Sequence, residues 1–290
     1  MNWNSPEIRG IVQLGIKEDA ARQDLTTQTL IPSELKIEAQ IRSKSTGVAC
    51  GLPLAGAFFK QLDPLVRFTT KVGEGQRVKP GAVLAVIRGK ARAILSGERA
   101  ALNALQHLSG IATFTQAQVR RLHVRRPAIY DTRKTLPGWR ALQKYAVRCG
   151  GGKNHRMSLK DGVLIKDNHL QIVRLIRKDW VGAVKRLQRS RPGMLVEMEI
   201  QTPRDVRDAL VLRPSQVLLD NMRPSQLRPL ITLLRDRLPR VEVEISGGVR
   251  TEQLPAFRRL NVDRISMGRL THSAPAFDCA LDITRVLHAR

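Results

Sequence analysis

Polar and charged residues follow a series of short apolar runs in the second half of the chain. The runs are AIYDTRK, GVLIKDN, MLVEMEI, SQVLLDN, VEVEISGG and DRISMGR, each followed by a helix-like stretch. Parallel α/β folds place their chemistry at the carboxyl ends of such strands. The candidate site is therefore the set of residues at those ends: Asp131, Arg133, Lys134, Lys166, Asp167, Glu199, Asp220, Ser246, Gly247, Gly248 and Gly268.

These residue types suit a polyanionic substrate that needs a metal ion. Two carboxylates, Glu199 and Asp220, would face a set of basic residues: Arg99, Arg133, Lys134, His155, Arg156 and Lys166. The Ser-Gly-Gly turn at 246–248 and the Gly268 turn resemble the phosphate cradle that barrels build after their last strands. No one of these signals decides the chemistry, but their combination favours an anion-binding catalytic site.

The elements that must position this site alternate along the chain. The last four apolar runs are spaced by roughly 20 to 26 residues, enough for one strand, one helix and two loops. This spacing predicts a parallel α/β arrangement, either a barrel or an open doubly wound sheet. The two late glycine turns favour the barrel.

A short helix is predicted between two basic clusters in the segment from 131 to 169. Pro137 lies near its start, an apolar face follows, and the glycines at 150–152 end it. Arg133 and Lys134 precede the helix, and His155 and Arg156 follow it. So much positive charge beside an apolar helix is costly without an anionic partner, which again predicts an anion site.

The first 110 residues have a different character. The stretch KVGEGQRVKPGAVLAVIRG combines glycine turns with short Val/Leu/Ile segments, which predicts antiparallel pairing. Leu102, Leu105, Leu108 and Ile111 recur at three-residue steps and predict a helix within GERAALNALQHLSGIAT. Asp24, Thr26 and Thr27 are expected to cap a helix or to fix a turn.

Composition limits the possible classes of protein. With 290 residues, 42% of them hydrophobic, the chain can bury a substantial core. It has no run of about 18 apolar residues and no secretory signal at its start, so we expect a soluble, cytoplasmic protein without membrane association. The three cysteines, Cys50, Cys149 and Cys279, are expected to be buried free thiols.

The formal charge of +25 would attract many polyanions, including nucleic acid. The basic residues are spread along the whole chain, however, and aromatic residues are only 4% of it. A single-strand binder would interleave stacking aromatics with its basic groove. Nucleic-acid association is therefore not expected, and steering of small anionic substrates remains an alternative reason for the charge.

The segment around residues 131–169 resembles the signature of the quinolinate phosphoribosyltransferase family. The resemblance extends over nearly the whole chain, through DLTTQTLIP, GVACGLPLA, GERAALNALQHLSGIAT, LLDNM, ISGGV and ISMGRLTHSAPAFD in the family's order. It implies an α/β fold with an N-terminal α/β sandwich domain at 1–112, joined by the C-terminal segment 276–290. The catalytic domain, at 113–275, is expected to be an incomplete α/β barrel with fewer than eight strands.

The resemblance also implies the reaction and the roles of the site residues. Phosphoribosyl transfer from 5-phosphoribosyl 1-pyrophosphate (PRPP) to quinolinate, with decarboxylation, would give nicotinate mononucleotide. Arg133, Lys134, His155, Arg156 and Lys166 match positions that bind these two substrates. Glu199 and Asp220 match the acidic pair expected to hold the ribose hydroxyls and Mg²⁺, and Lys134, which belongs beside the other basic residues, is expected to be catalytic together with this pair. Residues of the glycine turns, Ser246, Gly247, Gly248 and Gly268, would bind the 5′-phosphate.

A homodimer is implied as well, with Arg99 acting in the neighbouring subunit's site, and dimers that assemble into hexamers are an alternative. Two rival functions remain. One is a related protein with another substrate, such as the paralogue associated with molybdenum transport, and the two retained basic clusters argue against it. The other is a basic binding protein without turnover, and the intact acidic pair argues against that.

Overall fold

The chain forms two main sheets of different kinds, one in each of two structural units. The computed structural model describes residues 1–124 and 126–287. The first unit comprises residues 1–117, 135–151 and the chain from 270 onward, and the second comprises 118–134 and 152–269. The predicted domain boundaries at 112 and 275 stay predictions, and residues 288–290 of the predicted C-terminal segment lie outside the described residues.

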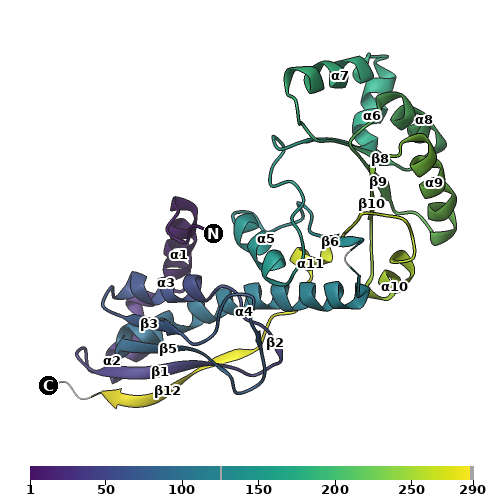
Figure 1. Ribbon diagram of the computed structural model, residues 1–290. Helices are drawn as coiled ribbons and strands as arrows, with labels where there is room; N and C mark the ends of the chain where they lie inside the picture. The colour runs from purple at the N-terminus through teal and green to yellow at the C-terminus, as the bar shows by residue number, and fades with distance from the viewer. Residues whose placement is uncertain (125, 288–290) are drawn as a thin grey trace. The chain divides into compact units, whose positions relative to one another are not determined.

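The first unit contains a four-stranded antiparallel sheet in the order β12-β1-β5-β3 (Figure 1). Its strands are β1 (Lys36–Ser43), β3 (Arg67–Thr70), β5 (Val83–Lys90) and β12 (Cys279–Leu287), and a small sheet pairs β2 (Gly47–Val48) with β4 (Arg77–Val78). The antiparallel pairing predicted around Gly75 and Gly81 is confirmed, and both glycines adopt positive φ. The last strand of the chain thus pairs with the first.

Helices complete this unit. They are α1 (Pro6–Glu18), α2 (Leu25–Leu30), α3 (Leu52–Leu62), α4 (Ala91–Leu122), which continues into the second unit from residue 118, and α5 (Arg140–Cys149), with a short turn of 3-10 helix at Ala21–Gln23. The predicted helix around Leu105 is confirmed and is longer than expected, because α4 has 32 residues. Asp24 caps α2 by accepting a hydrogen bond from the amide of Thr27 at 3.0 Å, as predicted.

Helix α5 is the helix predicted between the two basic clusters. It begins at Arg140, three residues after Pro137, and ends before Gly150. A Cβ at position 150 would lie 2.4 Å from the carbonyl oxygen of Ala112, so only glycine allows this close approach to α4. The glycine run therefore both ends α5 and lets it pack.

The second unit contains a six-stranded parallel sheet in the order β6-β11-β10-β9-β8-β7. The strands are β6 (Ala128–Tyr130), β7 (Val163–Ile165), β8 (Val196–Ile200), β9 (Gln216–Asp220), β10 (Glu242–Ser246) and β11 (Arg264–Ser266). Every apolar run singled out in the sequence contains one of them. Six strands, with β6 and β7 at the two edges, agree with the predicted incomplete barrel.

Helices α6 (Asp167–Leu175), α7 (Trp180–Ser190), α8 (Pro203–Leu212), α9 (Pro224–Arg237) and α10 (Leu254–Phe257) follow the strands, with a 3-10 turn at Thr251–Gln253 and α11 (Arg269–His272) after β11. In Figure 1, α6, α8 and α9 lie along one side of the sheet. Among the described residues, no helix has both the length and the hydropathy that crossing a membrane would require.

Alternation along these strands separates two kinds of side chain. Successive residues of a strand point to opposite faces of the sheet. Val196, Met198 and Ile200 alternate on β8 with Glu197 and Glu199, and all five are buried. The sheet thus has one apolar face and one polar face, and the polar face carries the site.

Candidate active site

The candidate residues of the second unit lie where its strands end. Arg133 and Lys134 follow β6, Lys166 follows β7, and Gly268 follows β11. Glu199 is the fourth residue of β8, Asp220 ends β9, and Ser246 ends β10 before the two glycines. Because these parallel strands are neighbours, their carboxyl ends meet at one edge of the sheet. The fold therefore brings together the residues that the sequence singled out in this unit.

Arg133 and Arg156 form the cationic side of the site. Burial, and after it the charge of Arg133, lower the pKa of Arg156. The two guanidinium groups therefore repel each other. Arg156 is held by a hydrogen bond from Nη1 to the carbonyl oxygen of Gly162 at 2.8 Å. Two mutually repelling guanidiniums suit a ligand with negative charge on more than one group.

The loop that carries Arg156 is anchored to the edge strand β6. The amide of Asp131 donates to the carbonyl oxygen of Lys153 at 3.0 Å, and the amide of Lys153 donates to Ile129 at 2.8 Å. The fully buried carboxylate of Asp131 accepts a hydrogen bond from Asn154 Nδ2 at 2.6 Å and another from the amide of His155 at 2.8 Å. Asp131 therefore fixes the position of residues 154–156.

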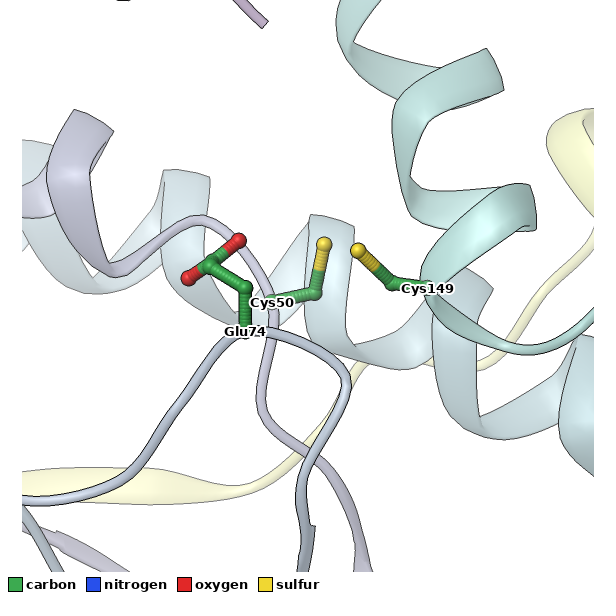
Figure 2. Close-up of side chains that lie close together, drawn as sticks. All are labelled: Cys50, Glu74 and Cys149. Carbon is green, nitrogen blue, oxygen red and sulfur yellow. The ribbon is translucent and has the colours of Figure 1, made fainter.

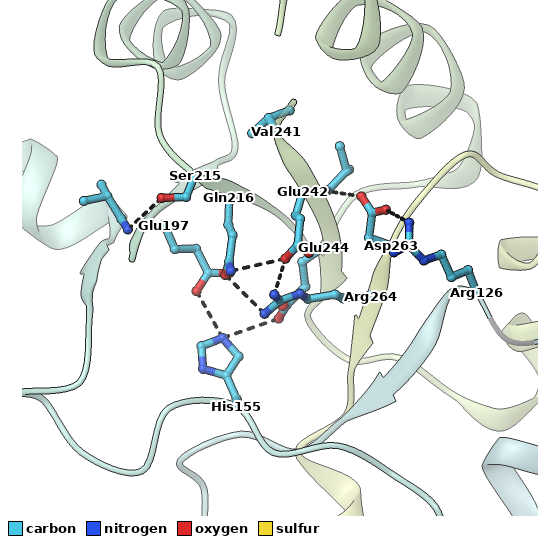
Figure 3. A network of polar contacts seen from close by, with 12 residues as sticks. Arg126, His155, Glu197, Ser215, Gln216, Val241, Glu242, Glu244, Asp263 and Arg264 are labelled. Carbon is cyan, nitrogen blue, oxygen red and sulfur yellow. Dashed lines mark hydrogen bonds and ion pairs between the residues drawn. The ribbon is translucent and has the colours of Figure 1, made fainter. Parts of the chain in front are cut away.

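His155 lies deeper than the strand ends. Its Nε2 is 3.0 Å from Oε2 of Glu197 and 3.7 Å from Oε1 of Glu244 (Figure 3). Burial, and after it the charge of Glu197, raise the pKa of Glu244 to about 7. The sequence predicts contact between His155 and substrate, and the structure places its ring against two carboxylates of the barrel interior.

Glu199 and Asp220 form the acidic side of the site. Burial raises the pKa of Glu199, Asp220 raises it further, and a hydrogen bond from Gln201 and the charge of Lys166 oppose the rise. Glu199 is 6% exposed, and Asp220 accepts a hydrogen bond from Asn221 Nδ2 at 2.6 Å. A pair of carboxylates on adjacent strands is a donor set that fits Mg²⁺, which prefers oxygen ligands and would relieve their repulsion.

The glycine turn after β10 has a conformation that side chains disfavour. Gly247 and Gly248 have φ values of 82° and 56°. A Cβ at position 247 would lie 2.4 Å from Oδ1 of Asn221, and the amide of Asn221 donates to the carbonyl oxygen of Ser246 at 3.2 Å. Consecutive backbone amides in such a turn form a concave anion site. Asn221 thus shapes the turn from the neighbouring strand end.

Arg99 is an exposed residue of α4 in the first unit. The strand-end geometry of the second unit does not include it, and its predicted role in a neighbouring subunit stays a prediction.

The cysteines are free, as predicted, but Cys149 is only partly buried. Cys50 and Cys149, far apart in sequence, face each other near Glu74 (Figure 2). The contact between the thiols and then burial raise the pKa of Cys50, and the same contact lowers the pKa of Cys149. The carboxylate of Glu74 already accepts hydrogen bonds from the amides of Gly51 and Leu52, so it caps α3 instead of serving as a ligand.

Several residues that build the site had no assigned role in the sequence analysis. They are Asn154, Glu197, Gln201, Asn221 and Glu244, together with Asp131, which was noted only as a strand end. A signal existed for Asn221, because asparagine adopts positive φ more readily than most residues, and here φ is 52°. Glu197 and Glu244 each alternate with apolar residues along a strand, and this alternation indicates that they lie on a polar face of the sheet.

The second unit thus has the fold and the strand-end chemistry of an α/β-barrel enzyme for an anionic substrate. Residues 24–109 match the family described as the N-terminal domain of quinolinate phosphoribosyl transferase, and residues 111–282 match its C-terminal domain. The chain therefore belongs to the quinolinate phosphoribosyltransferase family.

Individual relatives cover almost the whole chain. A probable nicotinate-nucleotide pyrophosphorylase [carboxylating] of Bacillus subtilis is 38% identical over 282 residues, covering 97% of this chain and 95% of the relative. Quinolinate phosphoribosyltransferase [decarboxylating] 1b of Nicotiana tabacum is 35% identical over 96% of this chain and 82% of its own length. The crystal structure of NadC from Streptococcus pyogenes superposes with a TM-score of 0.87 at 34% identity, covering 97% of each chain.

Proposed function

We propose that this protein transfers a phosphoribosyl group from PRPP to quinolinate, with release of pyrophosphate and carbon dioxide, to make nicotinate mononucleotide for NAD biosynthesis. The observation that carries the proposal is the meeting of a guanidinium pair and a carboxylate pair at the strand ends of the second unit. The relatives' names give this reaction, and the site has the charges that it requires.

Arg133 and Arg156 bind the two carboxylates of quinolinate. A planar guanidinium forms paired, charge-assisted hydrogen bonds with a carboxylate, and a dicarboxylate relieves the repulsion between the two arginines. Lys134 and Lys166 are compact cations beside them and bind the donor's phosphates or the remaining carboxylate charge. Both lysines are exposed at the strand ends, where a ligand reaches them without displacing the core.

Glu199 and Asp220 hold the ribose hydroxyls of PRPP and its Mg²⁺. When bound, the Mg²⁺ neutralises charge on the pyrophosphate leaving group. The backbone amides of the turn at 246–248 and of Gly268 bind the 5′-phosphate. These assignments place the two ends of the donor against different strand ends of one sheet.

The protein's own contribution to the reaction is orientation and charge. The ring nitrogen of quinolinate attacks the anomeric carbon as the bond to pyrophosphate breaks, and the developing positive charge on the ribose faces the acidic pair. The adjacent carboxylate then leaves as carbon dioxide, the electron pair of the broken C–C bond stays on the ring carbon beside the positively charged nitrogen, and that carbon takes up a proton from solvent. No covalent intermediate with the protein is needed, since positioning and electrostatic stabilisation lower the barrier.

The active assembly is a homodimer, or a hexamer built from such dimers, in the cytoplasm, with Arg99 completing the neighbour's site. Exposure of Arg99 on α4 supports its role, and the free cysteines agree with a reducing compartment. Mixing inactive Arg99→Ala and Lys134→Ala variants tests it. Subunit exchange should restore about one quarter of wild-type activity, because heterodimers contain one intact site. No recovery after proven exchange would exclude the shared site.

The function itself is tested by incubating the purified protein with quinolinate, PRPP and Mg²⁺ and identifying the products. We expect equal amounts of nicotinate mononucleotide, pyrophosphate and carbon dioxide, and no product when EDTA is added. Nicotinate replaces quinolinate in a parallel reaction. Turnover of nicotinate alone, or of neither acceptor by folded protein, would overturn the proposal.

A further inference from the structure

Two buried carboxylates of the barrel interior have no part in the reaction described above. Glu197 on β8 and Glu244 on β10 are 4% and 0% exposed. Oε1 of Glu197 and both oxygens of Glu244 have no hydrogen bond of normal geometry among the described residues, although Oε1 of Glu244 lies 3.7 Å from His155 and the side chain of Ser266 lowers the pKa of Glu244. Buried carboxylates with so few partners destabilise a fold. Packing therefore does not explain why two carboxylates lie one layer below the strand ends.

The hydrogen bonds of His155 supply that reason. Its Nδ1 accepts a hydrogen bond from the backbone amide of Arg156 at 2.8 Å, so Nδ1 must keep its lone pair. A neutral imidazole then carries its proton on Nε2, which donates to Glu197. Both ring nitrogens are therefore engaged inside the protein, one with the carboxylate and one with the amide of the residue that carries the guanidinium.

This pattern also decides between two chemistries for the cluster. Ligand atoms of His155, Glu197 and Glu244 lie within 4.8 Å of one another, a spacing at which three groups can hold a metal ion. A metal ion would need a free lone pair on Nε2. Because Nδ1 accepts the hydrogen bond from the amide of Arg156, the neutral ring carries its proton on Nε2, and that lone pair is not free. The geometry favours a hydrogen-bonded relay over a metal site.

We propose that Glu197 and Glu244 are positioning residues for quinolinate binding, which act through His155 to fix the backbone and guanidinium of Arg156. The proposal rests on the proposed function, in which Arg156 binds a substrate carboxylate. His155 is accordingly a positioning residue as well, since a substrate that bonded its ring would have to displace Glu197 or the amide of Arg156.

Charge supports the same assignment. Arg156 is half-buried, and the charge of Arg133 repels it, whereas the charge of Glu197 attracts it. In the absence of substrate, the carboxylate of Glu197 therefore offsets part of the repulsion between Arg133 and Arg156. The bound dicarboxylate would relieve the rest. Asp131 fixes the same loop through the amide of His155, so residues 154–156 are held from the strand edge and from the barrel interior.

The first test measures the ring nitrogens of His155 by ¹⁵N NMR at pH 7.5 without substrate, with His155→Gln to assign the signals. We expect a neutral ring protonated on Nε2. A ring protonated on Nδ1, or on both nitrogens, would overturn the relay. This readout needs no activity, so it decides the tautomer of His155 even if quinolinate is not the substrate.

The second test compares the kinetics of Glu197→Leu, Glu244→Leu and their conservative glutamine variants. The leucine variants should raise the KM for quinolinate roughly tenfold or more and change the KM for PRPP less than about threefold. Glu197→Gln keeps an acceptor for Nε2 and should recover most of the loss. Equal changes in both KM values, or no recovery with glutamine, would contradict positioning.

Gln216→Leu is the matched control. Gln216 is a 4% exposed polar residue of β9, on the strand between β8 and β10, and it contacts Glu242 and Arg264 instead of His155. Its loss should leave the KM for quinolinate unchanged. If Gln216→Leu raises that KM as much as Glu197→Leu does, the effect is general to the interior and the proposal fails. Lack of wild-type turnover with quinolinate would instead count against the proposed function.

Discussion

The antiparallel sheet of the first unit and the polar face of the parallel sheet of the second bury opposite kinds of side chain. On β1 and β5 the buried residues are at most 2% exposed and, apart from Ser43, apolar: Ile37, Ala39, Ile41, Leu84, Ala85 and Ile87. On the polar face of the parallel sheet they are Glu197, Glu199, Gln216, Glu244 and Ser266. Apolar burial stabilises by roughly 25 cal/mol per Å², whereas carboxylate burial costs free energy.

The difference indicates that apolar burial stabilises the fold, whereas the polar face of the parallel sheet carries the candidate site. The parallel sheet tolerates its polar face because its other face is apolar, through residues such as Met198, Val217 and Ile245. In our proposals, polar groups at the strand ends bind a ligand, and Glu197 and Glu244, one layer below, hold Arg156 in place. The antiparallel sheet contains no buried carboxylate among its described residues, so its substitutions should change stability and leave the chemistry alone.

The largest effect is expected for Arg156→Ala. The value of kcat/KM for quinolinate should fall roughly 100-fold or more, because a charge-assisted contact with the substrate is lost. The free energy of unfolding should stay the same or rise, since repulsion by Arg133 is relieved. Steady-state kinetics and urea unfolding measure the two quantities. Arg207→Ala, at an exposed position on α8, is the control and should change neither quantity. If Arg156→Ala loses stability but keeps its activity, the assignment of Arg156 to substrate binding is wrong.

Ile41→Ala should do the opposite. Removing this fully buried side chain from β1 should lower the free energy of unfolding by about 2–5 kcal/mol, with kcat/KM per folded molecule unchanged. Ile283 on the neighbouring β12 is 52% exposed, so Ile283→Ala should cost less than about 1 kcal/mol. A selective loss of quinolinate turnover in Ile41→Ala would show that the first sheet takes part in the chemistry.

Glu244 should make stability depend on pH. Its folded-state pKa is about 7, above its ordinary value of 4.5, because of burial and the charge of Glu197. The folded protein therefore binds this proton more tightly than the unfolded chain does. Stability should fall through this group as the pH rises from about 4.5 to 7 and level off above. Urea unfolding of Glu244→Gln should lack this decline, and identical pH profiles for both proteins would contradict the assignment.

The smallest effect is expected at the cap of α2. Asp24→Ala should cost about 1 kcal/mol in unfolding experiments at pH 7, whereas Asp24→Asn keeps the cap. The hydrogen bond from Thr27 lowers the pKa of Asp24, so its charge contributes above pH 4 and that contribution is lost as the pH falls through the lowered pKa. A cost for Asp24→Ala that grows toward low pH would contradict this reading.

Every strand of the parallel sheet could be predicted from the sequence. Each short apolar run forms a strand, and the polar residues that follow the run lie at the carboxyl end of that strand. It also placed Glu199, Asp220 and the 246–248 turn together. Contacts of His155 with Glu197 and Glu244 could not be predicted, since they depend on how a loop folds back into the barrel. The contact between Cys50 and Cys149 could not be predicted either, because the two residues lie far apart in the sequence.

The central claim is that Arg133 and Arg156 recognise a dicarboxylate. Calorimetric titration of quinolinate and of nicotinate, which has one carboxylate, into the wild type and an Arg133→Ala/Arg156→Ala double variant tests it directly. We predict that the wild type binds quinolinate roughly 100-fold more tightly than nicotinate, and that the folded double variant loses this preference. A double variant that keeps the wild-type preference for quinolinate would contradict the account.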